Sequence, residues 1–485
     1  MNREKLIDLD KEQLALLDEI IKRHIPNKPV WAYGSRVTWK ASEISDLDLT
    51  VFDCDPTEVF NLKEAFVESD LLISVDVMDW ESIPEKFKNN IKKKYVVLQG
   101  KTELAGWREV KLGEVADINP TESVSKGAKL PKVLMGFLVP FTKRIPKYVM
   151  GAYKGGSKFK NGDTLVARIT PCLENGKTSF VDFLENGKVG FGSTEFIVLR
   201  ERKNITNKHF LYYLAISNNF REVAIKSMTG TSGRQRVQTD EVFKYNFSLP
   251  PLPEQKAIAE VLSSLDDKID LLHRQNKTLE NIAQTLFRQW FVEDADEDWE
   301  TNKIPDEFDL TMGQSPPGSS YNESQNGIPM FQGNADFSFR FPKNRIYTTE
   351  PKRFAEKFDT LISVRAPVGD QNMAIEKCCI GRGVAAFKYK KDGSFYTYTY
   401  FKMMSLMDKV KQFNQEGTVF GSISKSDFEN FSITIPPIKL VQTFQKIVKP
   451  IDDKIIFNQS QIRTLENLRD TLLPKLMSGT VRVVA

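Results

Sequence analysis

The stretch Pro250-Pro251-Leu252-Pro253, followed sixteen residues later by Asp266-Asp267-Lys268-Ile269, occurs in this chain a second time. The second copy reads Pro436-Pro437-Ile438-Lys439 and Asp452-Asp453-Lys454-Ile455, at a constant offset of 186 residues and without a gap. A gapless match of this length predicts an internal repeat. We therefore expect a leader of about 106 residues followed by two related units of roughly 185 residues each.

Each unit ends in a heptad pattern that predicts one long helix. Apolar residues recur every seven positions, with a second set interleaved, as in the seam of a coiled coil. In the first copy the main set is Ile258, Leu265, Leu272, Leu279 and Leu286. About 40 residues make a rod of roughly 60 Å, and the two seams most simply pack on each other. Asn276 and Asn458 interrupt the seams, which either fixes their register or marks frayed positions.

Ahead of each helix lies a segment in which strand-like runs alternate with turns. Asp163-Thr164-Leu165-Val166 in the first segment is answered by Asp359-Thr360-Leu361-Ile362 in the second. Runs of this length with few polar residues are typical of strands. We expect two mixed α/β globules, each followed by its helix.

Composition excludes several classes of protein. The chain has 485 residues, 40% of them hydrophobic, and no apolar run long enough to span a membrane. Its four cysteines lack metal-ligand spacing and it has only three histidines, so a zinc site or a disulfide framework is not expected. The first ten residues are charged and do not resemble a signal peptide. We expect a multidomain, cytoplasmic protein.

Charge is distributed unevenly along the chain. The net charge is +4, but residues 107–249 carry 23 Lys+Arg against 13 Asp+Glu, whereas the leader is acidic. Clustered cations favour a surface that faces a polyanion such as DNA. A solvated basic face is the alternative, and charge alone does not separate the two.

The paired units resemble the specificity subunit of type I restriction–modification systems. The resemblance rests on the opening Trp107-Arg108-Glu109-Val110-Lys111-Leu112-Gly113-Glu114-Val115, on the duplicated proline-rich and Asp-Asp-Lys-Ile motifs, and on Met312-Gly313-Gln314-Ser315-Pro316-Pro317-Gly318-Ser319-Ser320. It spans about residues 107 to 480. In the second unit the opening motif is eroded, with Phe308-Asp309-Leu310 where a fuller pattern is expected.

The resemblance implies a division of labour. Each globule would read one half of a split double-stranded DNA site, with the antiparallel helices as a spacer. The helices would also dock two adenine-specific methyltransferase subunits, joined by ATP-dependent motor–nuclease subunits, while the specificity subunit itself is non-catalytic. S-adenosylmethionine and ATP would be used by those partners, and DNA recognition needs no cofactor. The expected domains are target-recognition domain 1 at 107–253, a central coiled-coil helix at 254–293, target-recognition domain 2 at 299–437 and a distal coiled-coil helix at 438–480.

Candidate DNA-reading residues are cationic or amide side chains near glycines. A basic, glycine-rich loop holds Lys154, Lys158 and Lys160, suited to phosphate contacts. A second loop holds Arg234, Gln235 and Arg236, whose side chains can pair with guanine and adenine edges. Chemical equivalents in the second unit are Gln332, Asn334, Arg365 and Lys425. For each of them a solvated surface position is the alternative.

The leader, residues 1–106, carries a different signature. Trp31-Ala32-Tyr33-Gly34-Ser35-Arg36 is followed by Asp46-Leu47-Asp48-Leu49, and Asp76 lies in a later strand-like run. This pattern resembles the minimal nucleotidyltransferases, a small α/β fold. The resemblance implies that Gly34, Ser35 and Arg36 bind a nucleoside triphosphate and that Asp46, Asp48 and Asp76 hold Mg²⁺. Residues i and i+2 of a strand share a face, which suits a paired carboxylate site. A retained fold without activity, acting as a docking module, is the alternative.

Two functions therefore compete. In the first, the chain is a DNA-binding specificity subunit with an appended nucleotidyltransferase-like domain. In the second, the chain is a Mg-dependent nucleotidyltransferase that the recognition domains deliver to DNA. A plain coiled-coil scaffold would not account for the duplicated globules. The first interpretation explains more of the chain and is preferred.

Overall fold

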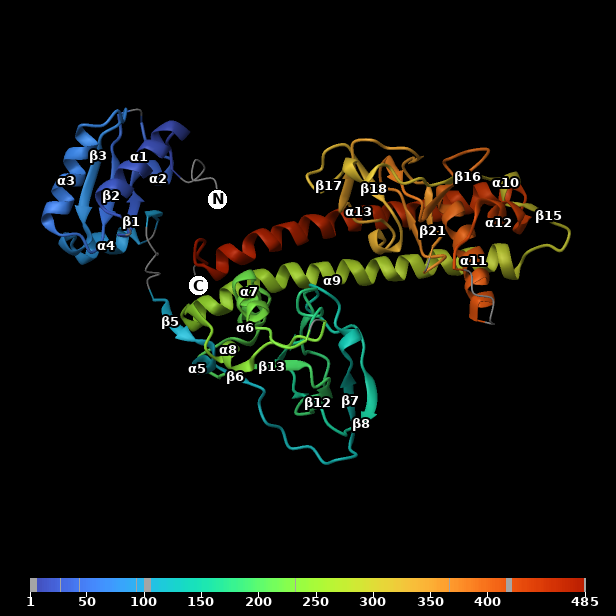
Figure 1. Cartoon of the computed structure of the whole chain (residues 1–485), viewed down its shortest axis with the longest axis horizontal. Coiled ribbons are helices and arrows are strands. Elements are labelled where there is room, and N and C mark those ends of the chain that lie inside the picture. The colour runs from blue at the N-terminus through green and yellow to red at the C-terminus, as the bar shows by residue number, and fades with distance from the viewer. Residues whose placement is uncertain are drawn as a thin grey trace. The chain divides into compact units, whose positions relative to one another are not determined.

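The computed structural model describes residues 7–483 except 27, 43, 93, 100–105, 232, 366 and 416–420, and side chains are described up to 408 in the helix that ends at Gln415. The chain divides into two compact units, Met1–Val261 with Leu473–Ala485 and Leu262–Leu472. Each is described by itself (Figure 1). In the part of the chain so described, no helix is long and apolar enough to cross a membrane.

The N-terminal domain is a four-stranded sheet with helices α1 (Lys11–His24) and α3 (Pro56–Val67) on one face. The strand order is β3-β2-β1-β4, with β2 and β3 parallel and the other pairs antiparallel. Alternate residues of the strands enter two cores: Leu47 and Leu49 pack under α1 and α3, whereas Trp31 and Tyr33 pack on the opposite face. The strands and remaining helices are β1 (Val30–Tyr33), α2 (Ser35–Thr38), β2 (Leu47–Val51), β3 (Val75–Asp79), α4 (Glu85–Ile91) and β4 (Val96–Gln99).

The first recognition domain contains two four-stranded sheets, in the orders β11-β10-β13-β6 and β8-β7-β12-β9, and a two-stranded ribbon β14-β5. Helices α6 (Lys208–Ile216), α7 (Asn218–Lys226) and α8 (Thr239–Phe243) enclose the core beside the first sheet. The other elements are β5 (Arg108–Lys111), α5 (Leu112–Val115), β6 (Ala116–Ile118), β7 (Lys129–Val133), β8 (Val149–Ala152), β9 (Lys158–Phe159), β10 (Thr164–Ala167), β11 (Thr178–Phe180), β12 (Gly190–Gly192), β13 (Phe196–Glu201) and β14 (Asn246–Leu249).

The second recognition domain repeats this plan. Its sheets have the orders β16-β24-β21-β22 and β17-β19-β18-β23-β20, and its ribbon is β15-β25. In both domains the second sheet contains one parallel pair, β7-β12 and β18-β23. The elements are β15 (Glu300–Lys303), α10 (Ile304–Glu307), β16 (Phe308–Met312), β17 (Tyr321–Asn322), β18 (Ile328–Phe331), β19 (Ile346–Thr348), β20 (Phe354–Ala355), β21 (Thr360–Ser363), β22 (Gln371–Met373), β23 (Cys378–Ile380), β24 (Val384–Tyr389), α11 (Tyr396–Gln415), α12 (Lys425–Asn430) and β25 (Ser432–Ile435).

The opening motif of the second recognition domain lies at Trp299, where the domain was expected to begin, and not at Phe308, where the sequence analysis placed the motif. Trp299 and β15 occupy the place of Trp107 and β5, because each strand pairs with the last strand of its domain and leads into a short helix. The Glu114 carboxylate accepts the Lys111 amide at 3.1 Å, and the Asp306 carboxylate accepts the Lys303 amide in the same way at 2.9 Å. The predicted erosion at Phe308 is therefore wrong, since Phe308 begins β16, the next strand.

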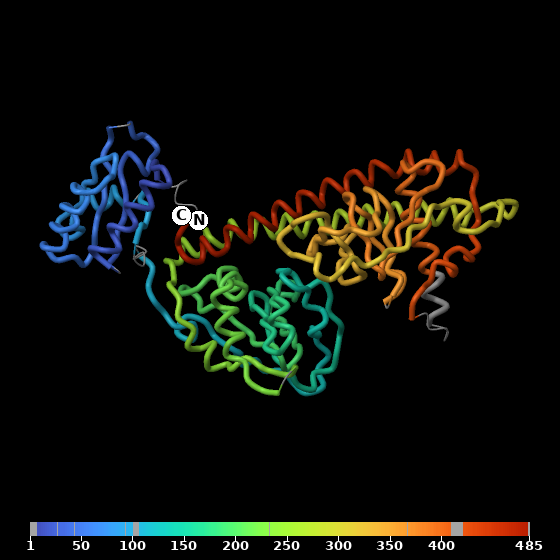
Figure 2. Tube along the Cα trace, turned by 45° about the horizontal axis from the view of Figure 1, so that its top comes forward, coloured from blue at the N-terminus to red at the C-terminus, as the bar shows by residue number. Residues whose placement is uncertain are grey.

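The two predicted long helices are α9 (Leu252–Arg288) and α13 (Ile438–Met477). Within the second unit they run side by side and antiparallel (Figure 2). Successive residues of α9, Asp266, Asn276 and Phe287, contact Arg469, Asn458 and Phe444 of α13, which are in the reverse order. Ile269 and Leu272 pack with Ile462 in the seam. Asn276 and Asn458 are both fully buried, and Asn458 Nδ2 donates to Asn276 Oδ1 at 2.8 Å. The two seam asparagines thus meet, which favours the register interpretation over fraying.

Candidate nucleic-acid interface and nucleotidyltransferase site

The loop that holds Arg234 and Arg236 projects from the first recognition domain. Thr229 and Arg236 form an antiparallel bridge at its base, and Gly230 and Gly233 adopt positive φ angles of +128° and +77°. Such angles favour glycine, so the glycines allow the tight excursion. The loop presents Arg234 exposed, with no partner for its guanidinium among the residues that the structure describes.

Arg236 is differently placed. Its guanidinium donates to both carboxylate oxygens of Glu195, at 2.7 to 3.0 Å. This ion pair raises the pKa of Arg236 and occupies its planar donor edge. Gln235 is half-buried, and its carbonyl accepts the Thr170 amide at 3.0 Å. Of the two arginines, Arg234 therefore has the freer donor groups.

In the predicted lysine loop, one lysine is exposed and the other two have hydrogen-bond or ion-pair partners. Lys154 is exposed. Lys158 Nζ donates to the Glu122 carbonyl, and Lys160 forms an ion pair with the Glu122 carboxylate at 2.7 Å. Burial opposes the charge of Glu122, but hydrogen bonds from Lys160 and Arg200 hold its pKa below the usual value. Lys158 and Lys160 thus already have partners in a polar cluster around Glu122, so a phosphate would have to compete with these partners for them.

Arg200 completes that cluster. It donates to Asp163 at 2.6 and 2.7 Å and to Glu122 at 2.6 Å. Asp163, the first residue of the Asp-Thr-Leu-Val motif, is buried and also accepts the Lys160 amide. The motif therefore stabilises the turn into β10.

The predicted residues of the second recognition domain also differ in availability. Gln332 and Arg365 are exposed, and Arg365 forms a backbone bridge with Ser422. The Asn334 amide donates to the Asp370 carboxylate, so the donor predicted for adenine is occupied. Lys425, at the start of α12, is exposed and pairs with Glu429 at 3.2 Å.

The sequence prediction missed Glu195, which controls the Arg236 side chain. It lies 41 residues from Arg236 along the chain and just before β13. No local motif marks such a partner, because β-sheet pairing brings the two segments together.

The predicted carboxylates of the N-terminal domain lie on adjacent strands. Asp48 is paired with Tyr33 of β1 and, on the other side, with Asp76 of β3. A Cβ atom on Gly34 would lie 2.0 Å from Asp48 Oδ2, and Gly34 has φ of +82°. Only glycine fits this turn, so the backbone that leads into α2 approaches the carboxylate closely. Gly34, Ser35, Asp48 and Asp76 thus form one cluster, the carboxylate cluster.

Electrostatics at the carboxylate cluster favour a cation. Partial burial raises the pKa of Asp48, and the charges of Asp76 and Asp46 raise it further. Burial, and then the charges of Asp48 and Asp76, raise the pKa of Tyr33 to about 12. A bound divalent ion would relieve this repulsion. Asp46 accepts a hydrogen bond from Ser74, and the described residues contain no three-ligand group arranged to hold a metal ion. The three-carboxylate site remains a prediction.

Arg36 does not fit its predicted role. It is buried, and its guanidinium donates to the carbonyls of Ser45 and Asp8, each at 2.9 Å. These bonds stabilise the loop ahead of Asp46. Arg36 therefore supports the site rather than contacting a triphosphate.

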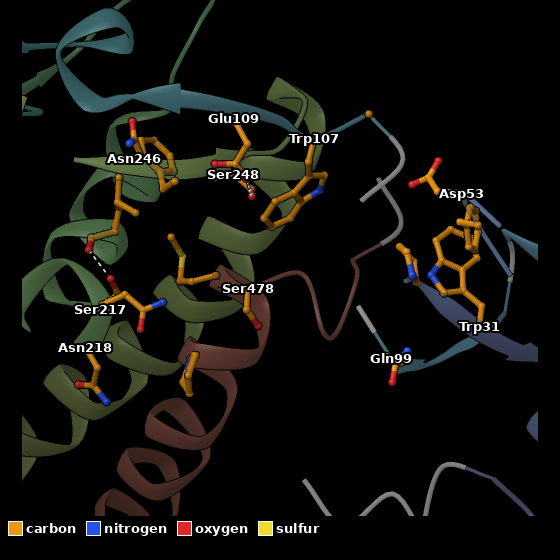
Figure 3. Close-up of a pocket in the computed structure, with 18 of the residues that line it drawn as sticks. Trp31, Asp53, Gln99, Trp107, Glu109, Ser217, Asn218, Asn246, Ser248 and Ser478 are labelled. Carbon is orange, nitrogen blue, oxygen red and sulfur yellow. Dashed lines mark hydrogen bonds between the residues drawn. The ribbon is translucent and has the colours of Figure 1, made fainter. Parts of the chain in front are cut away.

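Figure 3 shows residues of a cavity whose lining comes from two parts of the first unit. Trp31, Asp53 and Gln99 belong to the N-terminal domain, and Trp107 and Glu109 to the first recognition domain. Residues 100–105, which join the two parts, lie outside the described residues, so each side is considered by itself. Neither side contains Asp48 or Asp76. The cavity is separate from the carboxylate cluster.

Comparison with known proteins agrees with this architecture. Residues 105–281 and 296–467 match the family described as "Type I restriction modification DNA specificity domain", and residues 5–103 match "Polymerase beta, Nucleotidyltransferase". The "Putative type I restriction enzyme MjaX specificity subunit" of Methanocaldococcus jannaschii is 32% identical over 66% of this chain and 79% of its own length. The structure of the type I restriction–modification S subunit from M. genitalium superposes with a TM-score of 0.50 at 18% identity, covering 76% of this chain and 96% of that one, and supports the fold.

The N-terminal domain has its own relative. The "Probable protein adenylyltransferase MntA" of Haemophilus influenzae is 44% identical over 98 residues, which are 20% of this chain and 86% of that protein. Taken together, two duplicated recognition domains and a paired helical spacer define a DNA specificity protein. The chain belongs to the type I restriction–modification DNA specificity family and carries a nucleotidyltransferase-like domain ahead of its recognition domains.

Proposed function

We propose that this chain selects a split DNA sequence for a type I methyltransferase and its motor–nuclease subunits. The observation that carries the proposal is the duplication: two domains of one fold, each attached to an antiparallel helix pair, present different side chains. Such an arrangement reads two unlike half-sites across an unread gap. Methyl transfer from S-adenosylmethionine and ATP hydrolysis belong to the partner subunits, two of which are adenine methyltransferases.

Arg234 provides the test in the first half-site. It is exposed on a projecting loop without a carboxylate partner among the described residues, so it can contact DNA without first breaking an ion pair. Arg234→Ala should weaken binding of the assembled methyltransferase to its cognate duplex by about 1–3 kcal/mol. The matched control is Lys226→Ala, which removes one exposed charge from α7, where Lys226 pairs with Glu222.

Fluorescence anisotropy with cognate and scrambled duplexes at fixed salt would measure both variants. A loss confined to cognate DNA in Arg234→Ala supports base contact. An equal loss on both duplexes would indicate a phosphate contact. Unchanged affinity on both would remove Arg234 from the interface.

A second candidate function resides in the N-terminal domain. The close approach of Gly34 to Asp48, and the pairing of Asp48 with Asp76, are suited to holding Mg²⁺ and a nucleoside triphosphate. The bound triphosphate would supply the nucleotidyl group, which would pass to an acceptor as pyrophosphate leaves, with Mg²⁺ stabilising the charge on the phosphates. The similarity to a protein described as an adenylyltransferase also favours this activity.

The test is binding of ATP with Mg²⁺ to the full chain by calorimetry, followed by transfer of label from radiolabelled ATP. Asp48→Asn should remove Mg²⁺-dependent binding, and Asp46→Asn should abolish transfer. Asp70→Asn, an exposed carboxylate elsewhere in the domain, is the control. If the Asp48 and Asp46 variants behave like this control, the domain is a docking module.

A further inference from the structure

The loop of residues 381–383 joins the two sheets of the second recognition domain. It leaves β23 in one sheet and enters β24 in the other. Its sequence is Gly381-Arg382-Gly383, and sequence reasoning did not single it out. Both glycines are buried, whereas the Arg382 side chain is exposed. The loop thus exposes one cationic side chain between two buried glycines.

Close backbone packing fixes this loop. A Cβ atom on Gly383 would lie 2.1 Å from the Gln332 carbonyl oxygen, and one on Gly313 would lie 2.2 Å from the Gly381 carbonyl oxygen. The Gly381 amide donates to Phe331 at 2.8 Å. The loop cannot shift without breaking these contacts, so the position of the Arg382 backbone is set in advance. Such pre-organisation reduces the cost of binding.

Arg382 also lacks an internal counter-charge. No side-chain partner holds its guanidinium within the described part of the domain. The carboxylates of the adjoining loops have other partners: Asp336 pairs with Arg345 at 2.6 Å, and Asp370 accepts from Asn334. Arg382 therefore keeps its planar donor edge for an external acceptor.

The first recognition domain has different residues in the corresponding turn. The Arg168 amide donates to the Glu195 carbonyl at 2.9 Å, and the Val364 amide donates in the same way to the Gly383 carbonyl at 2.9 Å. The segment 193–195 is thus the counterpart of 381–383. At the position of Gly383 the first domain has Glu195, which holds Arg236, and at the position of Thr194 the second domain has Arg382, which has no side-chain partner among the described residues. Two domains that share a backbone differ in charge at this junction, as readers of unlike half-sites should.

A second cation lies beside the loop. Arg365 follows Val364, whose amide is bonded to Gly383, so the two arginines come from neighbouring segments. Arg365 is exposed, as is Gln332, whose carbonyl packs on Gly383. The junction therefore gathers cationic and amide side chains at one end of the β21-β24 pair.

We propose that Arg382 reads a guanine in the half-site of the second recognition domain, by donating two hydrogen bonds to its O6 and N7 atoms. The planar guanidinium fork matches these two acceptors, which occur together in the major groove only on guanine. This assignment rests on the proposed function, because it requires the chain to direct methylation to a split site.

The test compares methylomes in a methylation-free host that expresses the partner methyltransferase with the wild-type chain, Arg382→Ala or Lys388→Ala. Lys388 is an exposed cation toward the other end of β24, so its removal changes the charge equally. We expect Arg382→Ala to accept other bases at one guanine of one half-site, with discrimination falling roughly 5- to 150-fold. Lys388→Ala should keep the wild-type motif.

The remaining outcomes are decisive. An unchanged motif at full methylation in Arg382→Ala overturns the assignment. If Arg382→Ala abolishes methylation, the purified complexes are compared on duplexes with 7-deazaguanine at each guanine. One substitution that weakens wild-type binding but not the residual binding of Arg382→Ala supports the proposal, and equal weakening in both complexes overturns it. Absence of any split motif with the wild-type chain would instead refute the proposed function.

Discussion

Replacing Arg340 with methionine should loosen the second recognition domain from the helix pair. Arg340 is buried, pairs with Asp452 of α13, lies 3.8 Å from Glu280 of α9 and stacks on Tyr400 of α11 at 3.4 Å. Removing one partner of a buried pair costs about 3–5 kcal/mol, because the other charge stays desolvated. Asp452 retains a hydrogen bond from Thr397 at 2.6 Å, so we expect a loss of about 3 kcal/mol at pH 8.

The loss should depend on pH with a definite sign. Burial raises the pKa of Asp452 while Arg340 opposes the rise, and the pKa of Glu280 is governed by the same two effects. Without Arg340, both folded-state pKa values rise further above their unfolded values. A carboxyl whose pKa is raised on folding loses stability as pH increases through that interval. The defect of Arg340→Met should therefore be smaller at pH 5 than at pH 8.

Hydrogen exchange of the α11 amides over residues 396–408 measures this effect locally, once rates are corrected for intrinsic exchange at each pH. A loss of about 3 kcal/mol corresponds to roughly 150-fold faster exchange. Arg353→Met, at an exposed arginine of the same domain, is the control and should leave α11 protected. Unchanged protection in Arg340→Met, or a defect of equal size at both pH values, would refute the argument.

Three further predictions follow from buried or strained positions. Asn276→Leu should lower the free energy of unfolding by about 1–3 kcal/mol in thermal unfolding, because the buried Asn458 amide loses its partner. Adding Asn458→Leu should recover most of that loss, and no recovery in the double variant would contradict this. Asp359 has a pKa raised by burial from 3.8 to about 6, so wild-type stability should fall as pH rises between these values, and Asp359→Asn should flatten that slope in denaturant titrations. Gly34→Ala should remove Mg²⁺-dependent ATP binding in calorimetry, since its Cβ would overlap Asp48 Oδ2; retained affinity would disprove the close approach.

The two long helices could be predicted from sequence because their signals are local and periodic, whereas the meeting of the two seam asparagines was left open until the structure. A seven-residue repeat marks the buried seam, and Asn276 and Asn458 interrupt it at positions that face each other in the antiparallel pair. The carboxylate cluster was equally accessible, since Gly34 directly follows β1 and Asp48 lies on the adjacent strand β2, with one short helix and a loop between them.

The pairing of surface charges could not be predicted in this way. Lys160 meets Glu122, and Arg236 meets Glu195, only after the sheets assemble. The opening motif of the second domain was placed at Phe308 instead of Trp299 because Pro305 stands where the first copy has Gly113, although the strand and the carboxylate that caps the short helix are retained. Sequence patterns identify the elements here, whereas free and occupied cations are distinguished only by tertiary contacts.

The central claim is that this chain supplies sequence specificity to a methyltransferase, and a long-read methylome tests it most directly. A methylation-free host would express an adenine methyltransferase subunit of the same type I system, with and without the 485-residue chain. We expect a split N6-methyladenine motif that appears only when the chain is present. Absence of any motif, with both proteins abundant and assembled, would contradict the account.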